Sequence, residues 1–216
     1  DNDKYAEYLG EEVKSWSYMK FPFIRSIGPA EGWYRVGPLA RVNNADSFST
    51  PEAEAARKEF AAVTNGKPCN VTMGYHWARM IELLHSTEKI KELLNDPDLQ
   101  GTDLVTKGER RNEGIGIIEA PRGTLFHHYQ VDDQDQVTIA NLIVSTTSNN
   151  VPMNLAVQKV AEDHLSGQAE ISEGMLNRVE VAIRAYDPCL SCATHAMGQM
   201  PLTVELYDHE GTMIDT

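Results

Sequence analysis

Two cysteines near the end of the chain have the spacing of a metal-binding pair. Cys189 and Cys192 lie in the run DPCLSCATH at 187–195, and His195 follows the second cysteine by three positions. Two thiolates with two residues between them can bind one soft metal ion from the same turn. The only other cysteine is Cys69, so the chain cannot form a four-thiolate site alone. The rest of any metal shell must come from water, from His195 or from another polypeptide.

Several other kinds of site share this spacing. A dithiol redox site would place the pair at the start of a helix within a strand–helix–strand unit, whereas the residues before Cys189 favour a helix. Haem attachment needs a histidine directly after the second cysteine, and Ala193 stands there. A zinc site of Cys189, Cys192 and His195 lacks a fourth ligand. An accidental pair of structural thiols is a further alternative to a transition-metal site shared with other thiolates.

The overall composition is that of a globular protein of one large or two small domains. The 216 residues are 41% hydrophobic and carry a net charge of −13, which argues against a nucleic-acid partner. No apolar run approaches the roughly 18 residues that span a bilayer, and the polar start has no signal peptide. Three unevenly spaced cysteines do not form a disulfide framework. We therefore expect a cytoplasmic protein without a membrane span.

The first half of the chain is expected to contain three helices. A short helix is predicted near 4–13, followed by an extended arm rich in aromatic residues, glycine and proline. Thr50 is placed to cap a helix that begins at Pro51 and ends at about Val63. The clearest helix covers 74–95. Its apolar face recurs at three- and four-residue steps through Met80, Leu84, Thr87, Ile90 and Leu94.

The second half begins with β-rich runs. After a polar connection, isoleucines at 115–118 lead into a Pro-Arg-Gly turn, and runs at 124–131 and 137–144 flank an acidic turn, which indicates a hairpin. Helices follow, one capped by Asn149 or Asn150 and ending near His164, the other over 172–185. Apolar alternation over 202–207 predicts a strand before a turn at 208–211. The fold class expected is α+β and mainly helical: a helix bundle with a small antiparallel sheet or hairpin and a C-terminal strand.

The cysteine motif resembles that of a known enzyme family. The run RAYDPCLSCATH at 184–195 is similar to the C-terminal nickel-binding motif of nickel–iron hydrogenase large subunits, closest to the cytoplasmic bidirectional NAD-reducing type. EAPRGTLFHHY at 119–129 resembles a second motif, and segments 34–41 and 174–180 also fit. The family's other cysteine pair, Arg-x-Cys-Gly-x-Cys, is absent, and Cys69 cannot replace it. From about residue 5 onward the chain resembles only the C-terminal half of such a subunit.

The resemblance implies roles for the motif residues. Cys189 would be a terminal nickel ligand, and Cys192 would bridge nickel to an iron that carries CO and cyanide ligands. Arg122 would face the position at which H2 reacts and would polarise or deprotonate it. A structural ion pair is the alternative for Arg122, with Asp187 as a plausible partner.

Further roles concern the surroundings of the metals and the tail. Pro121 and Thr146 would surround the cyanide ligands. His127 would donate a hydrogen bond to the bridging sulfur, with a satisfied core histidine as the alternative. His195 would join a magnesium site in the mature form, once a protease has removed the tail after it. The resemblance therefore divides the chain into a large-subunit portion, 1–195, and an extension removed on maturation, 196–216.

The function implied is part of the catalytic subunit of a nickel–iron hydrogenase, which cleaves H2 heterolytically and reversibly. The implied partners are the N-terminal half of the large subunit with the other cysteine pair, an iron–sulfur small subunit, a diaphorase-type flavoprotein leading to NAD, a maturation chaperone and the C-terminal protease. The isolated chain is expected to be inactive and to hold no assembled metal centre. The alternative is a metal-free precursor or assembly module that binds the chaperones and the protease.

Overall fold

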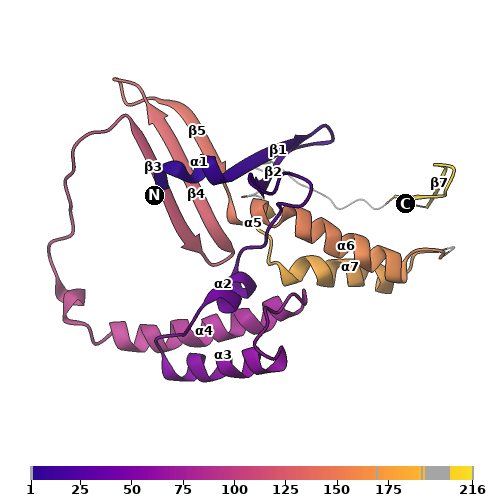
Figure 1. Cartoon of the computed structure of the whole chain (residues 1–216), viewed down its shortest axis with the longest axis horizontal. Helices are drawn as coiled ribbons and strands as arrows, with labels where there is room; N and C mark the ends of the chain where they lie inside the picture. The colour runs from indigo at the N-terminus through magenta and orange to yellow at the C-terminus, as the bar shows by residue number, and fades with distance from the viewer. Residues whose placement is uncertain (1, 169, 191, 193–204, 216) are drawn as a thin grey trace.

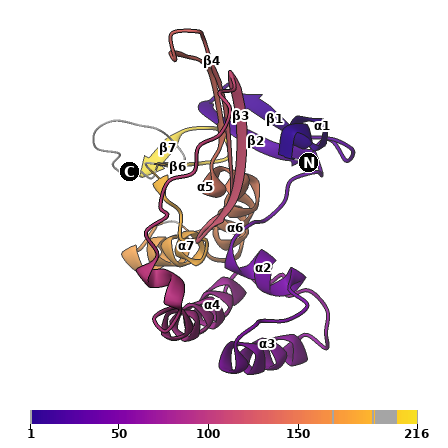
Figure 2. The same ribbon diagram turned by 90° about the vertical axis from the view of Figure 1, so that its left-hand side faces the viewer.

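The computed structural model describes residues 2–168, 170–190, 192 and 205–215 (Figure 1). Within these residues, the helices are accompanied by three separate antiparallel sheets of two, three and two strands. Helices α3 and α4 lie side by side, as do α6 and α7, and the three-stranded sheet stands apart from both pairs (Figures 1 and 2). The α+β class predicted from the sequence is confirmed.

The N-terminal segment differs from the prediction. After a 3-10 turn (Asn2–Lys4), helix α1 covers only Tyr5–Tyr8, and strands β1 (Leu9–Lys14) and β2 (Ser17–Ile24) form a hairpin. The predicted helix over 4–13 is therefore wrong beyond Tyr8, and the irregular arm predicted after it begins only at Arg25, after β2. Gly10 pairs with Phe23 and lies against its ring, where a Cβ would overlap, so cross-strand contact decides this segment over helix propensity.

Three helices follow: α2 (Pro38–Asn44), α3 (Pro51–Val63) and α4 (Gly74–Leu93). Helices α3 and α4 agree with the prediction from the sequence. Thr50 precedes α3 as predicted, but its hydroxyl lies 2.8 Å from His85 Nδ1 instead of capping the helix. Glu88 of α4 supplies the cap, because its carboxylate accepts from the main-chain N–H groups of Glu52 and Ala53. The start of α3 is thus held by side chains of α4.

Helix α4 has two apolar faces, and only one of them is buried. Tyr75, Ala78 and Ile81 are 0–2% exposed and lie in a core shared with α2, α3 and the end of α7. The periodic apolar residues predicted from the sequence lie on the other face. Met80, Ile90 and Leu94 are 59–70% exposed.

A long connection leads from α4 to the three-stranded sheet. It includes a 3-10 helix (Pro97–Gln100) and the segment 101–112 before strand β3 (Glu113–Ala120). Strand β4 (Gly123–Val131) pairs with both β3 and β5 (Val137–Ile143), and its pairing with β5 confirms the predicted hairpin. A second small core, of Tyr5, Phe126 and Ile143, joins the first helix to this sheet.

The chain then forms α5 (Ser145–Ser148), α6 (Asn150–His164) and α7 (Glu173–Ala185). Strands β6 (Leu206–Tyr207) and β7 (Met213–Asp215) pair with each other around the turn predicted at 208–211. The tail therefore forms its own hairpin. The first part of the predicted strand, 202–204, lies outside the described residues. No described helix is both long enough and apolar enough to cross a bilayer.

Candidate functional site

The Pro-Arg-Gly turn between β3 and β4 needs its glycine because another segment crosses it. Gly123 has φ +137°, and a Cβ there would overlap the Val36 side chain. Gly37, at φ +94°, brings its own backbone against the carbonyl of Arg122, and a Cβ at Gly37 would lie 2.9 Å from that oxygen. The two glycines thus allow the backbone of segment 36–37 to cross in contact with the backbone of the turn. This crossing fixes where Arg122 leaves the sheet.

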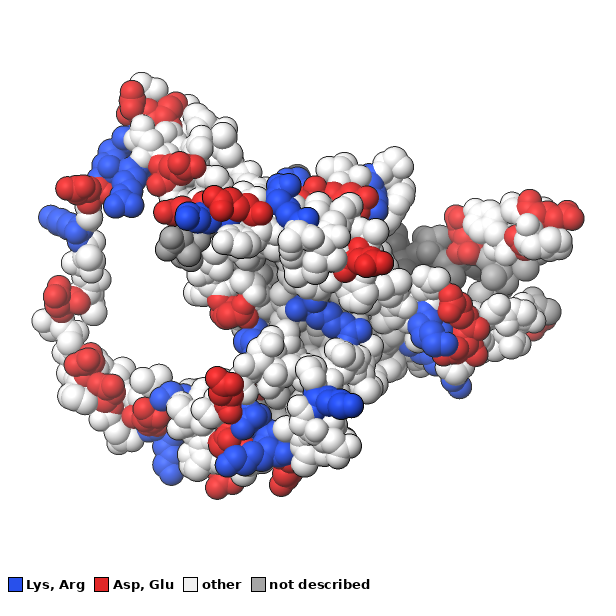
Figure 3. All heavy atoms as spheres, in the orientation of Figure 1, with Lys and Arg blue, Asp and Glu red and all other residues white. Residues whose placement is uncertain are grey.

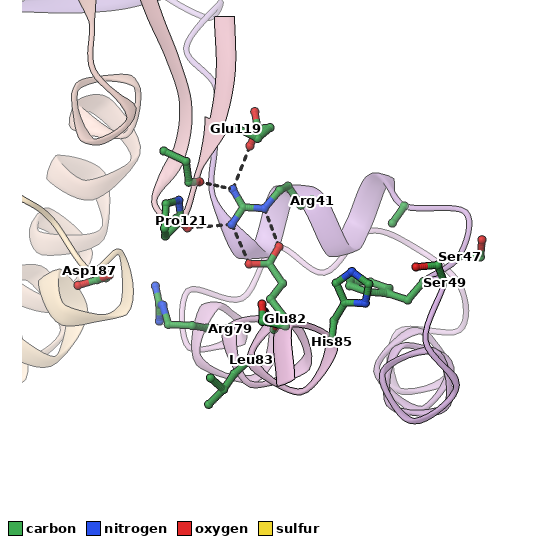
Figure 4. Close-up of a pocket in the computed structure, with 14 residues that line it drawn as sticks. Arg41, Ser47, Ser49, Arg79, Glu82, Leu83, His85, Glu119, Pro121 and Asp187 are labelled. Atoms are coloured by element: carbon green, nitrogen blue, oxygen red, sulfur yellow. Dashed lines mark hydrogen bonds and ion pairs between the residues drawn. The ribbon is translucent and has the colours of Figure 1, made fainter. Parts of the chain in front are cut away.

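Arg41 of α2 holds the same turn from the other side (Figure 4). Its Nε and Nη2 donate to the two carboxylate oxygens of Glu82 over 2.6 and 2.7 Å. Its Nη1 donates to Glu119 Oε2 and to the carbonyl of Ala120, and Nη2 also donates to the carbonyl of Pro121. These five hydrogen bonds use all five N–H groups of the guanidinium.

The charges around Arg41 support this arrangement. Burial lowers the pKa of Arg41, but the hydrogen bonds and charges of Glu82 and Glu119 outweigh it and raise the pKa above its ordinary value. The ion pairs border a groove of about 890 Å³ between α4, the segment after α2, the end of β3 and Asp187. Arg41 thus joins α2, α4 and the turn along one wall of this groove.

Asp187 begins the cysteine loop in a conformation that ends α7. Its φ is +51°, in the left-handed region that aspartate tolerates better than most residues. The Nε of Arg122 donates to the main-chain oxygen of Asp187 over 2.8 Å and lies 3.2 Å from its carboxylate. Both side chains are close to half exposed. The ion-pair partner expected for Arg122 is therefore found in the structure.

Helix α5 connects the Pro-Arg-Gly turn to the cysteine loop. Ser145 donates its hydroxyl hydrogen to the carbonyl of Gly123 over 2.7 Å. Thr146 accepts a hydrogen bond from the main-chain N–H of Cys189 over 3.1 Å. Thr146 is 3% exposed, so its hydroxyl is fixed within the protein. Two adjacent residues of α5 thus position the site. Ser145 holds Gly123, the neighbour of Arg122, and Thr146 holds the backbone of Cys189.

Most of the buried polar segment around α5 was not predicted from the sequence. All residues from Ser145 to Asn150 are at most 6% exposed. Asn149, predicted only as a helix cap, accepts from the N–H of Val36 over 3.0 Å. Tyr75 donates to the carbonyl of Val36, and its burial, with Tyr186 nearby, raises its pKa. The sequence feature that could have indicated this buried segment is its run of six consecutive polar residues directly after an apolar strand.

The two histidines of β4 have partners within the sheet. His127 Nδ1 lies 3.0 Å from the hydroxyl of Tyr129. His128 contacts Glu113 over 2.7 Å and Tyr5 over 3.2 Å. The hydrogen bond from Gln130, and then the hydrogen bond and charge of His128, lower the pKa of Glu113. These contacts give His128 a structural role. They also show that the hydroxyl of Tyr129 contacts His127 at Nδ1.

The structure brings four of the predicted site residues together: Arg122, Asp187, Thr146 and Cys189 are linked by the contacts above. Pro121 is the neighbour of Arg122, but its carbonyl is turned to Arg41. Cys192 follows in the same loop and is exposed. His195 lies outside the described residues.

The donor set suits a soft metal but supplies only part of a shell. Cys189 is half-buried and Cys192 is exposed, and paired thiolates favour nickel, iron or zinc over hard cations. Among the described residues, no group of three or more histidine, cysteine, aspartate or glutamate side chains is arranged to hold a metal ion. Cys189 and Cys192 therefore fit as two ligands of a soft metal, for which the described residues supply only part of a shell.

The chain is similar to known proteins over most or all of its length. The family described as nickel-dependent hydrogenase matches residues 1–195. The chain is 52% identical to the NAD-reducing hydrogenase HoxS subunit beta of Cupriavidus necator, over all of this chain and 45% of that protein. It is 45% identical to an F420-non-reducing hydrogenase iron-sulfur subunit of Archaeoglobus profundus, over 98% of this chain and 45% of that protein.

A solved structure is similar over most of the chain. It is a crystal structure of an NAD+-reducing nickel–iron hydrogenase in the H2-reduced state, with a TM-score of 0.85 and 53% identity, covering 90% of this chain and 43% of that one. The chain thus spans about half the length of the curated relatives it matches.

Proposed function

The chain belongs to the nickel-dependent hydrogenase family, and from this premise we propose that it forms part of the catalytic large subunit of an enzyme that cleaves H2 reversibly. The proposed electron path leads through the iron–sulfur clusters of a small subunit, then through a diaphorase-type flavoprotein, to NAD. The observation that carries the proposal is the linkage of Arg122, Asp187, Thr146 and Cys189. It joins a cation to a potential metal ligand in a chain with hydrogenase relatives.

Cys189 and Cys192 would hold nickel, and Cys192 would also contact an iron that carries CO and cyanide ligands. Bound there, the metals supply the heterolytic cleavage of H2. The remaining thiolates come from the part of a large subunit that the relatives carry in addition to the length matched here. Two thiolates from each portion complete a shell that neither forms alone, which agrees with the partial donor set described above.

The residues of this chain have distinct tasks around the thiolates. Arg122 presents a cation to the proton-transfer region, and its contact with the Asp187 carboxylate holds the guanidinium charge in place. A carboxylate beside the guanidinium can also receive a proton passed from the reacting group. Thr146 accepts from the N–H of Cys189, so its own hydroxyl hydrogen stays available as a donor to an anionic ligand such as cyanide.

Two further roles are proposed for the histidines His127 and His195. His127 would donate to the bridging sulfur through Nε2, because Nδ1 faces the hydroxyl of Tyr129. His195 would join a magnesium site after a maturation protease has removed 196–216, in a cytoplasmic enzyme assembled with a chaperone. The end of the family match at residue 195 supports this division of the chain.

A second candidate function is a metal-free precursor or assembly module. The partial ligand set and the tail hairpin beyond residue 195 favour it for the isolated chain. In that form the chain would present its tail to the processing protease and the chaperone. It would become catalytic only after the metals and the other half of the large subunit had joined.

The test is H2-dependent reduction of a viologen dye by this chain co-expressed with the remaining large-subunit portion, the maturation factors and the small subunit of the Cupriavidus necator relative. Activity that disappears in Cys189→Ala and Cys192→Ala variants supports the catalytic assignment. Full activity in either variant would show that these thiolates are not metal ligands. A fully assembled complex that contains metal and stays inactive would contradict the catalytic role.

A further inference from the structure

The exposed face of α4 is unusual for a helix on the surface of a globular protein. We call it the outer stripe, and its members are Met80, Leu83, Leu84, Ile90 and Leu94. Their exposed fractions run from 37% to 70%, and Leu94 directly follows the last residue of the helix. With the exposed Thr87 between Leu84 and Ile90, Met80, Leu84, Ile90 and Leu94 lie three or four residues apart along one side. The opposite face of the same helix is buried against α2 and α3. A helix that is apolar on both faces is typical of the interior of a larger protein.

The segment after α4 extends this unpartnered surface. Every residue from 91 to 112 is exposed, and Leu104 and Val105 are 84% and 75% exposed. In the space-filling view this connection arches away from the rest of the molecule and leaves an open gap between itself, α4 and the three-stranded sheet (Figure 3). The connection is anchored at its far end, where Arg110 contacts Asp135 and the carbonyl of Asp132.

The relatives indicate what covers this surface. The matched crystal structure keeps the fold over 90% of this chain, yet this region makes up only 43% of that chain. The larger part of the related subunit lies beyond the region of similarity. Leu83 also lines the groove that ends at Asp187, so the outer stripe is continuous with the site that needs further thiolates.

We propose that the outer stripe is the docking surface for the remaining portion of the large subunit, which packs an apolar helix face of its own against α4. The proposal rests on the proposed function, because the occupant is the portion that brings the other cysteine pair. Repeated steps of three and four residues fit helix-on-helix contact, in which side chains of one helix fill the grooves of the other. Docking there places the partner along the groove that leads to Asp187.

The experiment uses the whole chain, tagged and co-expressed with the unmatched portion of the Cupriavidus necator subunit beta. A double variant, Met80→Glu with Ile90→Glu, places two charges on the outer stripe. Both positions are about 60% exposed, so the isolated variant is expected to keep its circular dichroism and thermal unfolding. Co-purified partner per chain is expected to fall by about tenfold or more, because a buried unpaired charge opposes association.

The matched control places the same charges on exposed apolar residues elsewhere, through Val63→Glu at the end of α3 and Val137→Glu in β5. The control should co-purify with the partner like the unchanged chain. Equal co-purification of the stripe variant would overturn the docking surface. So would a failure of the unchanged chain to capture the partner, or a homodimer of the unchanged chain that the stripe variant converts to monomers. A complex that forms through the stripe and takes up no nickel would count against the proposed function alone.

Discussion

Arg122 and Asp187, which are 65 residues apart in the sequence, meet through both main chain and side chain. The guanidinium Nε lies 2.8 Å from the main-chain oxygen of Asp187 and 3.2 Å from its carboxylate. Asp187 stands two positions before Cys189, so Arg122 is tied to the loop that carries both cysteines. The pair joins the Pro-Arg-Gly turn to the cysteine motif, which the sequence alone could only suggest.

The first prediction separates a catalytic from a structural role for Arg122. In the assembled enzyme, Arg122→Lys should lose most of the H2-oxidation activity, by about tenfold or more, while metal content is kept. Lysine retains the charge but lacks the planar fork that contacts the main chain and carboxylate of Asp187 together. Activity is measured by dye reduction and nickel by mass spectrometry on the same samples. Loss of nickel from the variant would show that Arg122 maintains structure instead.

The second prediction concerns the hydroxyl of Thr146. Thr146→Val keeps the shape of the side chain but removes the acceptor for the N–H of Cys189. Stability should fall by about 1 to 3 kcal/mol, because a buried hydrogen bond is lost and no acceptor replaces the hydroxyl at that position. Thr146→Ser is the control, since it retains the hydroxyl and should lose less. Urea unfolding of the isolated chain measures both variants, and a loss in Thr146→Val no larger than that in Thr146→Ser would contradict the role given to the hydroxyl.

The third prediction concerns the clamp around Arg41. Arg41→Lys should lower the free energy of unfolding by about 2 kcal/mol, because an ammonium cannot make the bidentate contact with Glu82 and also reach the turn. Arg110→Lys is the matched control. Arg110 also contacts an aspartate and a carbonyl, but it is half exposed. Its replacement should therefore lower the free energy of unfolding by less than about 1 kcal/mol. Equal destabilisation of the two variants would contradict the special role of Arg41.

Local sequence patterns predicted the elements whose periodicity is strong. Helices α3, α4, α6 and α7 and the hairpin of β4 and β5 follow from apolar spacing and turn residues. The β1–β2 hairpin was missed, because contact of Gly10 with Phe23 is formed across the strands and leaves no local signal. The periodic face of α4 was identified correctly, yet only the structure shows that it is the exposed face.

The candidate site was predictable where a motif named its residues. Arg122, Asp187 and the cysteines were selected by motif, and the structure links them as an ion pair and a loop. Arg41 was not selected as a site residue, because its acceptors come from Glu82 and from 119–121, far along the chain. Ser145 was missed for the same reason, since its acceptor is the carbonyl of Gly123.

The fourth prediction concerns acid stability. The hydrogen bonds from Arg57 and from the main chain of Phe48 lower the pKa of Glu54 from its ordinary value of 4.5 to about 2. Because the folded-state pKa is below the unfolded one, this contribution is fully present above about pH 4.5 and is lost as the pH falls toward 2. Glu54→Gln should therefore be less stable than the parent at pH 6, and the difference should shrink at pH 3. Unfolding curves at both pH values measure it, and a constant difference would contradict the assigned cause.

The central claim is that Cys189 and Cys192 supply two ligands of a nickel–iron centre completed by another portion of the large subunit. The most direct measurement is the nickel and iron content, by mass spectrometry, of this chain purified alone and purified with the remaining large-subunit portion after co-expression with maturation factors. We predict no stoichiometric nickel in the chain alone, nickel and iron in the complex, and loss of nickel from the complex in Cys189→Ala and Cys192→Ala. Nickel retained by both variants, or a nickel–iron centre in the isolated chain, would contradict the claim.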